Sequence, residues 1–227
     1  MKNIVVLTGA GVSAESGLKT FRDANGLWEG HDVMEVASPQ GFAQNPELVL
    51  EFYNQRRRQL LTVPPNAAHK ALAQLESQFH VDIITQNVDD LHERAGSSQV
   101  LHLHGELLKA RSILTDEPVF ECREDIQWGD LGKDGHQIRP HIVWFGEAVP
   151  LLEDAISITE KANILIIIGT SMQVYPAASL IDFVEGNTPI YFIDPKPSIS
   201  PSFKRNLKII AKTAVEGVPE LVNTLLC

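Results

Sequence analysis

Cysteine and long apolar stretches are what this sequence of 227 residues has least of. Cys122 and Cys227 are too few for a disulfide framework, so a reducing compartment is expected. No stretch approaches the roughly 20 apolar residues that a membrane-spanning helix needs. The apolar run before Gly9 is also too short for a secretory signal. We therefore expect a cytoplasmic protein that does not contact membranes.

Basic charge is also in short supply, since 19 lysines and arginines face 29 aspartates and glutamates and give a formal net charge of −10. An acidic surface repels phosphate backbones, so we expect no nucleic-acid partner. The most concentrated basic patch, Arg56-Arg57-Arg58, is short. With 44% hydrophobic residues the composition is that of a globular protein, and the length suits one core with a small appended lobe.

Five β-branched apolar runs are typical of buried parallel strands, and they cover 4–8, 81–85, 100–103, 164–168 and 190–193. Amphipathic helical patterns alternate with them at 46–61, 67–78, 151–161, 176–184 and 218–226. This alternation predicts an α/β fold, a Rossmann-like doubly wound parallel sheet. We expect one domain over 1–227, with a Rossmann lobe at about 1–24, 66–106 and 141–227 and a smaller inserted lobe at about 25–65 and 107–140.

A glycine-rich segment at 9–17, Gly-Ala-Gly-Val-Ser-Ala-Glu-Ser-Gly, follows the first expected strand. Glycines at such a turn let a ligand approach the backbone, and the N-terminus of a following helix offers unpaired N–H groups to a pyrophosphate. Ala14 stands where the common dinucleotide motif has its third glycine. Taken alone, the segment fits a purely structural turn equally well.

Polar side chains end two other expected strands. Gln86, Asn87 and Asp89 follow the second strand, at the carboxyl edge where open α/β sheets bind ligands. A helix cap by Asn87 or Asp89 would explain them as well. His102 and His104 share one face of the third strand by its alternation. A histidine in that setting is more often structural than catalytic.

Together these segments resemble the sirtuin family of NAD-dependent protein-lysine deacylases. The glycine-rich segment continues into Thr20-Phe21-Arg22 and Gly26-Leu27-Trp28 as the family's cofactor loop does, and Gln-Asn-x-Asp and His-Gly-Glu recur at the family's separation. The resemblance runs from Gly9 to Leu226. It implies NAD as cofactor, acylated proteins as partners, and nicotinamide and O-acyl-ADP-ribose as products.

By this resemblance His104 is the catalytic base, Asn87 and Asp89 orient the ribose and the nicotinamide, and His102 is structural. The amide oxygen of an acyl-lysine attacks the anomeric carbon of the nicotinamide ribose, nicotinamide leaves, and the base then activates a ribose hydroxyl. A neutral imidazole with an ordinary pKa of about 6.5 suits that step. The implied cofactor-binding residues are Gly9, Ala10, Gly11, Ser13, Glu15, Thr20, Phe21, Arg22, Trp28, Gln86, Asn87, Asp89, His104, Gly169, Thr170, Ser171, Asp194, Pro195, Lys196 and Ala214.

A substrate groove is implied by two further segments. Residues 140–147 resemble the family's substrate-binding strand, and 169–171 with 174–176 resemble the loop opposite it. A peptide laid between them gains main-chain hydrogen bonds by strand addition. The implied substrate-binding residues here are Val143, Phe145, Gly146, Glu147 and Val174, of which the first two wall the lysine channel.

Tyr53 and Arg56 stand three residues apart and therefore share a helix face, where a phenol and a guanidinium can hold a carboxylate. A basic run on a helix is about equally often plain solvated surface. The Tyr-x-x-Arg pattern resembles the bacterial class III branch of the family, which removes succinyl and malonyl groups. We therefore expect acidic acyl groups, besides acetyl, among the substrates.

The zinc motif of the family is missing. Most sirtuins carry two Cys-x-x-Cys pairs in the small lobe, whereas residues 107–140 hold only Cys122, with His136 as a distant companion. We expect no zinc and no other metal site. The lobe must then rely on the packing of side chains such as Phe120, Ile126 and Trp128, or else be partly mobile.

Three other functions fit part of the pattern. An NAD hydrolase or ADP-ribosyl transferase would use the same site, a dehydrogenase would use a similar sheet, and a non-catalytic module would bind NAD alone. The irregular glycine motif and Gln-Asn-x-Asp argue against the dehydrogenase. The oligomeric state is left open.

Overall fold

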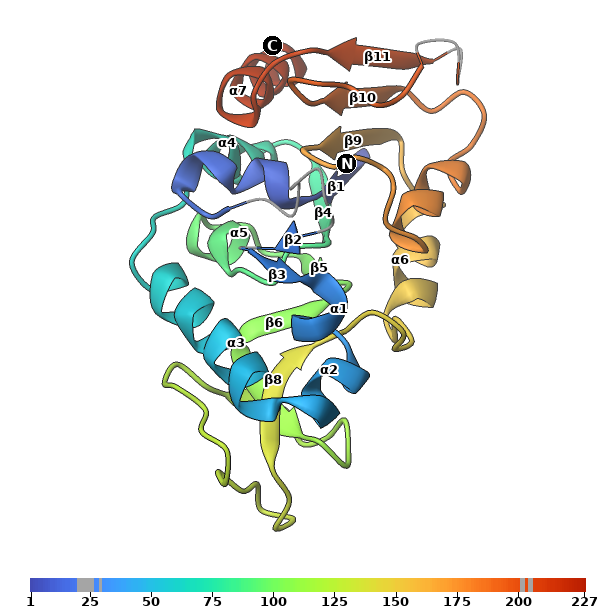
Figure 1. Cartoon of the computed structure of the whole chain (residues 1–227). Helices are drawn as coiled ribbons and strands as arrows, with labels where there is room; N and C mark the ends of the chain where they lie inside the picture. The colour runs from blue at the N-terminus through green and yellow to red at the C-terminus, as the bar shows by residue number, and fades with distance from the viewer. Residues whose placement is uncertain (20–26, 29, 201–202, 204–205) are drawn as a thin grey trace.

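The computed structural model describes residues 1–19, 27–28, 30–200, 203 and 206–227 (Figure 1). Its main sheet has six parallel strands in the order β11-β10-β9-β1-β4-β5. These strands are β1 (Asn3–Thr8), β4 (His80–Thr85), β5 (Val100–His102), β9 (Ile164–Ile168), β10 (Ile190–Ile193) and β11 (Leu207–Ile210). The predicted α/β, Rossmann-like fold class is confirmed.

Helices cover both faces of this sheet (Figure 1). One layer holds α4 (Ala67–Leu75) and α7 (Ala214–Leu226), and the other holds α6 (Leu152–Thr159) and the 3-10 helix η3 (Ala177–Asp182). Side chains of β1 alternate between the layers: Ile4 and Val6 pack with the first, and Val5 and Leu7 with the second. A strand buried on both faces has to be apolar throughout, which explains the unbroken run in the sequence.

The strand order reverses at β1, because β4 pairs with one of its edges and β9 with the other. Ligands of open α/β sheets bind beyond the carboxyl ends of the strands at such a reversal. We therefore expect a ligand site beyond the carboxyl ends of β1, β4 and β9.

The smaller lobe is built on a three-stranded antiparallel sheet in the order β7-β6-β8. Its α3 begins after Asn45, whose side chain accepts a hydrogen bond from Leu48 N, with Pro46 in the first turn. Val49 and Leu50 of α3 pack into the same core as side chains of β6 and β8. The remaining elements are α1 (Val33–Val36), α2 (Pro39–Gln44), α3 (Pro46–Leu60), α5 (Leu91–Arg94), β2 (Leu27–Trp28), β3 (His31–Asp32), β6 (Gly105–Ser112), β7 (Phe120–Glu121) and β8 (Ile138–Ile142).

One expected helix and the glycine-rich segment both form 3-10 structure. Residues 176–184 contain the 3-10 helix η3, where Ser179 Oγ donates to Pro176 O, 2.7 Å away, and backbone bonds span three residues. The glycine-rich segment forms two 3-10 turns, η1 (Ala10–Val12) and η2 (Ala14–Ser16), instead of leading into an α-helix. Its backbone is drawn toward the end of β9 by a bond from Gly11 N to Gly169 O.

Packing of the small lobe also differs from the expectation. Ile126 is 1% exposed and lies in the core, but Trp128 and Phe120 are 54% and 39% exposed. Phe120 belongs to β7, a two-residue edge strand with both side chains turned outward. Among the described residues, no helix is long and apolar enough to cross a membrane.

Candidate active site

The parallel sheet delivers most of the predicted cofactor residues to a single edge, because the carboxyl ends of parallel strands lie together. Trp28 is not among them: it lies in β2, with its ring 4.9 Å from that of Phe52. In chain order the residues at the edge are 9–13 after β1, 86–89 after β4, His104 after β5, 169–171 after β9, 194–196 after β10 and Ala214 after β11. Each strand of the sheet thus contributes one loop to the candidate site.

Glycines bring two of these loops into direct contact at the strand reversal. Gly11 N donates to Gly169 O at 2.8 Å, and Gly9 N donates to Ile168 O at 3.0 Å. A Cβ on Gly11 would lie 2.6 Å from Gly169 Cα, and one on Gly169 would lie 2.5 Å from Gly11 C. Gly169 also has a left-handed φ of 61°. The packing of the two loops therefore requires glycine, whatever ligand lies nearby.

Ser13 joins the loop after β1 to the loop after β4. Its hydroxyl donates to Asp89 Oδ2 at 2.9 Å and accepts from Asn87 Nδ2 at 3.2 Å. His69 Nε2 lies 3.4 Å from the same oxygen. All four side chains are buried. Three of the predicted site residues are thus brought into one hydrogen-bonded cluster.

His69 belongs to this cluster, although the sequence reasoning did not single it out. At the third position of α4 its Nδ1 accepts from the backbone N of the N-cap residue Asn66, 3.3 Å away. Asn66 Oδ1 lies 3.0 Å from the same nitrogen, so the N-cap residue holds Nδ1 while Nε2 faces Ser13 Oγ. Burial lowers the pKa of His69 to about 4, which keeps the ring neutral. Asn-x-x-His at the start of an amphipathic helix has capping-box spacing and could have identified it.

Asp89 both caps the turn before α5 and belongs to the candidate site. Its Oδ1 accepts from Leu91 N at 3.2 Å and so caps the turn before α5, while Oδ2 accepts from Ser13. Burial raises the pKa of this carboxyl to about 6, and the two hydrogen bonds oppose that rise. A carboxylate held this close to its point of titration is typical of functional sites.

His104 lies in the turn after β5, with Nδ1 3.0 Å from Gln86 O. A carbonyl oxygen only accepts, so Nδ1 carries the proton and Nε2 presents a lone pair. Burial lowers the pKa of His104, although the bond to Gln86 O opposes it. The side chain of Gln86 in turn donates to Thr170 Oγ1 at 3.2 Å. The imidazole therefore has the protonation state that a general base requires.

The loops after β10 and β11 form the other end of the edge. Asp194 is 1% exposed, and its Oδ1 accepts from Lys196 N at 2.8 Å. Glu15 Oε2 accepts from Val215 N at 3.2 Å, so Glu15 reaches the start of α7 beside Ala214. The structure thus brings the predicted residues Glu15 and Ala214 together, about 200 positions apart in the chain.

The expected substrate-binding strand ends early, which corrects that part of the prediction. β8 stops at Ile142, and a turn follows in which Glu147 Oε2 accepts from Trp144 N at 2.7 Å. The carboxylate of Glu147 also binds Arg139, with 2.6 Å between Oε1 and Nη1. Gly146 has a left-handed φ of 91°, which a continuing strand would not contain. Glu147 is thereby committed to closing this turn.

The two predicted walls of the lysine channel are held by backbone bonds. Val143 N donates to His104 O and Phe145 N donates to Ala37 O, each at 2.9 Å. Val143 is half-buried, whereas the side chain of Phe145 is exposed. Val143 is therefore tied directly to the backbone of the predicted base. Val174 lies half-buried on the loop after β9.

Tyr53 and Arg56 share a face of α3, against a group of aromatic rings. Tyr53 is 1% exposed, and its hydroxyl accepts from Trp144 Nε1 at 3.0 Å. Burial raises the pKa of Tyr53, so the hydroxyl keeps its proton. The guanidinium carbon of Arg56 lies 3.2 Å from the ring centroid of Phe52 and 5.2 Å from that of Trp28. A phenol proton and a guanidinium are thus held on one side of the small lobe.

Three predicted cofactor residues, Thr20, Phe21 and Arg22, lie outside the described residues. Within the described part of the chain, no group of three or more His, Cys, Asp or Glu side chains could hold a metal ion. Cys122 Sγ donates to Glu124 O at 3.6 Å. The absence of zinc stays a prediction.

Comparisons with known proteins agree with this architecture. The family model described as Sir2 family matches residues 9–176. A Helicobacter pylori protein named NAD-dependent protein deacylase is 60% identical over 226 residues, covering 100% of this chain and 98% of that protein. A protein of the same name from Bacteroides thetaiotaomicron is 52% identical over 232 residues, covering 100% and 99%.

Solved structures give the same result. A crystal structure of a Sir2 homologue in complex with NAD is 41% identical, with a TM-score of 0.89, and covers 99% of this chain and 90% of that one. A Sir2 protein bound to an acetylated peptide is 29% identical, with a TM-score of 0.80, and covers 97% and 92%.

The doubly wound sheet and the polar loops along its carboxyl edge define a Rossmann-like enzyme. With a family model that spans most of its length and relatives that match all of it, the chain belongs to the Sir2 family, the sirtuins.

Proposed function

We propose that the chain removes acyl groups from protein lysines in an NAD-dependent reaction that yields nicotinamide and O-acyl-ADP-ribose. The observation that carries this proposal is His104, whose Nδ1–H is held by Gln86 O at 3.0 Å and whose Nε2 is left as a base. The relatives named NAD-dependent protein deacylase, and the solved homologue with NAD, support it.

The residues at the edge of the sheet fit a dinucleotide. Hydroxyl, amide and carboxylate side chains at Ser13, Asn87 and Asp89 are the donors and acceptors that ribose hydroxyls and a carboxamide need. When bound, NAD supplies the ribose carbon that receives the amide oxygen of the substrate. In this assignment Asn87 and Asp89 orient the ribose and nicotinamide, and His104 takes a ribose hydroxyl proton onto Nε2.

The same proposal covers the remaining predicted cofactor residues and the organisation of the chain. The loops after β10 and β11 hold the adenosine half, and Thr20, Phe21 and Arg22 close over the nicotinamide end. The whole chain acts as one catalytic domain with the two lobes predicted above. It works in the cytoplasm and needs no zinc.

The role of His104 is tested by the variant His104→Ala. General-base catalysis contributes about 10²–10⁴-fold, so deacylation of an acetyl-lysine peptide should fall by at least about 10²-fold. NAD binding, measured by calorimetry, should persist because Ser13, Asn87 and Asp89 are unchanged. His136→Ala, in an exposed loop, is the control and should retain full turnover. Full turnover by His104→Ala would exclude the assignment.

The substrates include acidic acyl groups, succinyl and malonyl, in addition to acetyl. Trp144 occupies a lone pair of the Tyr53 oxygen, so the phenol proton remains available to a carboxylate. Arg56 on the same face of α3 adds a permanent positive charge. Together they offer the charge-assisted pair that a terminal carboxylate needs, and an acetyl group lacks that carboxylate.

The variant Arg56→Met tests the acyl preference, and Arg58→Met is its matched control, because Arg58 is exposed and bound to Glu51 and Asp125. Mass spectrometry of one peptide in acetyl and succinyl forms gives kcat/KM for both. Arg56→Met should lower the succinyl value at least about tenfold, the loss of roughly one charge-assisted bond, and leave the acetyl value nearly unchanged. An equal loss for both peptides would contradict a carboxylate-specific role.

The same assays separate deacylation from the other NAD-cleaving functions. Release of nicotinamide should require the acyl peptide. Release without it would indicate an NAD hydrolase, and labelled ADP-ribose retained on a protein would indicate an ADP-ribosyl transferase.

A further inference from the structure

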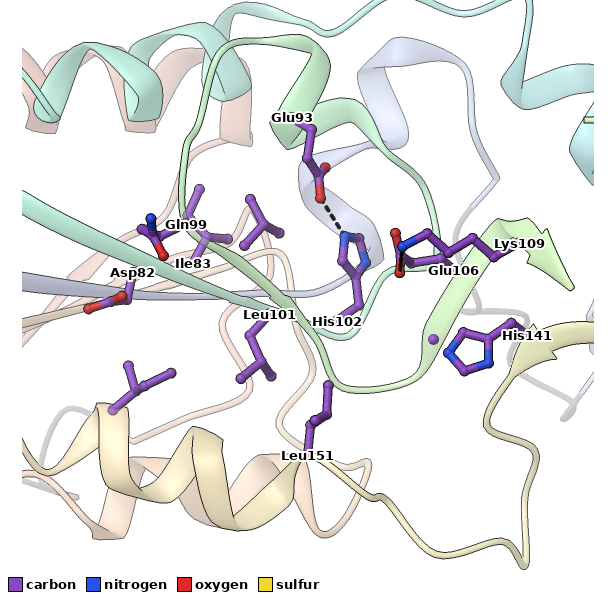
Figure 2. Close-up of a pocket in the computed structure, with 13 residues that line it drawn as sticks. Asp82, Ile83, Glu93, Gln99, Leu101, His102, Glu106, Lys109, His141 and Leu151 are labelled. Carbon is purple, nitrogen blue, oxygen red and sulfur yellow. Dashed lines mark hydrogen bonds and ion pairs between the residues drawn. The ribbon is translucent and has the colours of Figure 1, made fainter. Parts of the chain in front are cut away.

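A cavity of about 570 Å³ lies beside the edge strand β5 (Figure 2). Its polar lining includes two close pairs and three further residues: His102 with Glu93, Lys109 with Glu106, and His141, Asp82 and Gln99. None of these residues is among the predicted cofactor or substrate residues. His102 nevertheless connects the cavity to the candidate active site.

Both ring nitrogens of His102 face oxygen atoms, and the side chain is almost fully buried. Nδ1 lies 3.1 Å from the backbone O of Asn87, and Nε2 lies 2.7 Å from Glu93 Oε1, as the dashed line in Figure 2 shows. A carbonyl oxygen and an ionised carboxylate only accept hydrogen bonds, so both nitrogens must donate. The ring is then an imidazolium, with its charge balanced by Glu93.

The pKa values of the two partners agree with this geometry. Burial opposes the charge on His102, but the hydrogen bond and the charge of Glu93 outweigh it, so the pKa of His102 lies above its ordinary value. Burial also opposes ionisation of Glu93, but its bond to His102 prevails and the pKa of Glu93 lies below its ordinary value. A neutral pair with the proton on the carboxyl group is therefore disfavoured.

The carbonyl that His102 holds is the middle one of three in the turn after β4. Gln86 O accepts from His104, Asn87 O accepts from His102, and the next carbonyl, Val88 O, accepts from Leu107 N at 2.8 Å. The same turn presents the Asn87 amide to the candidate site. The orientation of that amide depends on where the turn's backbone is held.

Loss of one proton from His102 would break the bond to the turn and not the bond to Glu93. A charged acceptor forms the stronger hydrogen bond, so the remaining proton stays on Nε2 beside the carboxylate. Nδ1 then turns a lone pair toward Asn87 O, and two acceptors 3.1 Å apart repel each other. The neutral ring thus pushes on the backbone that the imidazolium holds.

We propose that His102, as an imidazolium clamped between Glu93 and the Asn87 carbonyl, is a positioning residue that holds the turn at 86–89 in the geometry for using NAD. Its deprotonation weakens the use of NAD at alkaline pH. This inference rests on the proposed NAD-dependent deacylation. It adds a residue that touches neither cofactor nor substrate and acts through Asn87.

Other charged groups face His102 from each element around it. Glu106 on β6 favours the positive charge of His102. Lys109 partly neutralises Glu106, since its Nζ lies 2.7 Å from Glu106 Oε2. Asp89 in the turn lies close enough for the two charges to interact. His92 on α5 has a pKa lowered well below its ordinary value, chiefly by burial, so it stays neutral. Burial lowers the pKa of His141 on β8 as well. Glu93, in hydrogen-bond contact, remains the decisive partner.

The variant Glu93→Gln keeps a hydrogen-bond acceptor for Nε2 but removes the charge that holds the second proton. An opposite charge at contact distance typically moves a pKa by about 1–3 pH units, so the pKa of His102 should fall by at least about one. The alkaline limb of kcat/KM for NAD, measured with saturating acetyl peptide, should move to lower pH by the same amount. General damage to the fold would lower the profile at every pH without moving the limb.

Asp82→Asn is the matched control. Asp82 lines the same cavity and faces a histidine of its own, with its Oδ2 3.3 Å from His80 Nε2, but it does not touch the turn at 86–89. The alkaline limb of kcat/KM for NAD in the Asp82→Asn variant should coincide with that of the unaltered protein. If Glu93→Gln also kept that limb while remaining folded, the proposal would be wrong.

Nitrogen NMR of the imidazole rings tests the clamp in the unaltered protein, without any assay of turnover. Both nitrogens of His102 should keep their protons to a higher pH than a free imidazole does, and Glu93→Gln should lose one of these protons at a lower pH than the unaltered protein. A neutral ring in the unaltered protein would overturn the proposal even if the enzyme deacylates normally. An imidazolium in a protein that lacks NAD-dependent deacylation at every pH would instead overturn the proposed function, and with it this role of His102.

Discussion

Asp89 is only 6% exposed, yet it accepts two hydrogen bonds, from Ser13 and from Leu91 N. Burial outweighs these bonds and raises the pKa of the carboxyl to about 6. At neutral pH the folded protein therefore carries a buried charge that costs stability. Side chains that lower the stability of the folded protein in this way are common in active sites, because function there constrains the choice of side chain.

The variant Asp89→Asn should consequently alter how stability depends on pH. The folded-state pKa of about 6 lies above the reference value of 3.8, so the folded protein binds this proton more tightly and gains stability as pH falls from about 7 to about 4. This pKa difference of roughly two units corresponds to a gain of about 3 kcal/mol in the free energy of unfolding. The variant, which has no titratable group at this position, should lack this gain. Urea unfolding of both proteins at several pH values measures the difference. A constant difference between pH 8 and pH 4 would contradict the raised pKa.

Which of these residues the sequence reveals depends on where their partners come from. Asn87, Asp89 and His104 stand directly after expected strands, and the resemblance of their motifs to those of the family predicts that they form one site. His69 and His102 acquire their roles from Ser13 and Glu93, which the fold brings to them. An i,i+3 or alternating pattern does not show such a partner, and the structural role expected for His102 came from the family resemblance.

At the scale of elements, the contact between the loop after β1 and the loop after β9 sets the geometry of the site. Gly11 and Gly169 allow these backbones to touch at the strand reversal, and Gln86 then bridges from the loop after β4 to Thr170. Any side chain at this contact would push the loops apart. The loops after β1 and β9 would then no longer lie at the distance that the candidate site at the carboxyl edge of the sheet requires.

The variant Gly169→Ala should be strongly destabilised. Its new Cβ would lie 2.5 Å from Gly11 C, and the φ of 61° is one that alanine rarely adopts. Backbone strain and overpacking each cost about 1–3 kcal/mol, so the free energy of unfolding should fall by at least about 2 kcal/mol. Gly186→Ala is the control, because its Cβ would meet nothing within 4 Å. Equal unfolding midpoints in urea for the two variants would refute this account.

The predictable elements were those with one continuous pattern. The run that became β1 is apolar because both faces of the sheet are covered there, and its short length and β-branched residues favour a strand over a buried helix. β11 was missed because it is a short edge strand that carries the exposed Lys208. The turn after β8 resembles a continuing strand in the sequence because Arg139 and Glu147, which close it, are eight residues apart. Such closing contacts appear only once the chain has folded.

At the scale of the whole molecule, buried polar side chains of α3 hold the small lobe together. Asn54 exchanges two hydrogen bonds with the backbone of Ile126, each at 2.9 Å, and accepts a third from Arg57 at 2.7 Å. Arg57, with 0% exposure, also donates to Leu107 O of β6. Cys122 bonds through its backbone to the same strand and packs against the lobe's core. These contacts link the helix, the long loop and the strand.

Metal chelation should therefore leave the molecule unchanged. We expect the purified protein to contain far less than one zinc per chain by elemental analysis, and EDTA to leave both Tm and deacylation unaffected. Asn54→Ala, in contrast, leaves the backbone groups of Ile126 and one donor of Arg57 without partners, and it should lower the free energy of unfolding by about 2–4 kcal/mol. Stoichiometric zinc, or a Tm that falls on chelation while Asn54→Ala has little effect, would show that a metal holds the lobe. The opposite pattern assigns that task to the hydrogen bonds of α3, which no chelator removes.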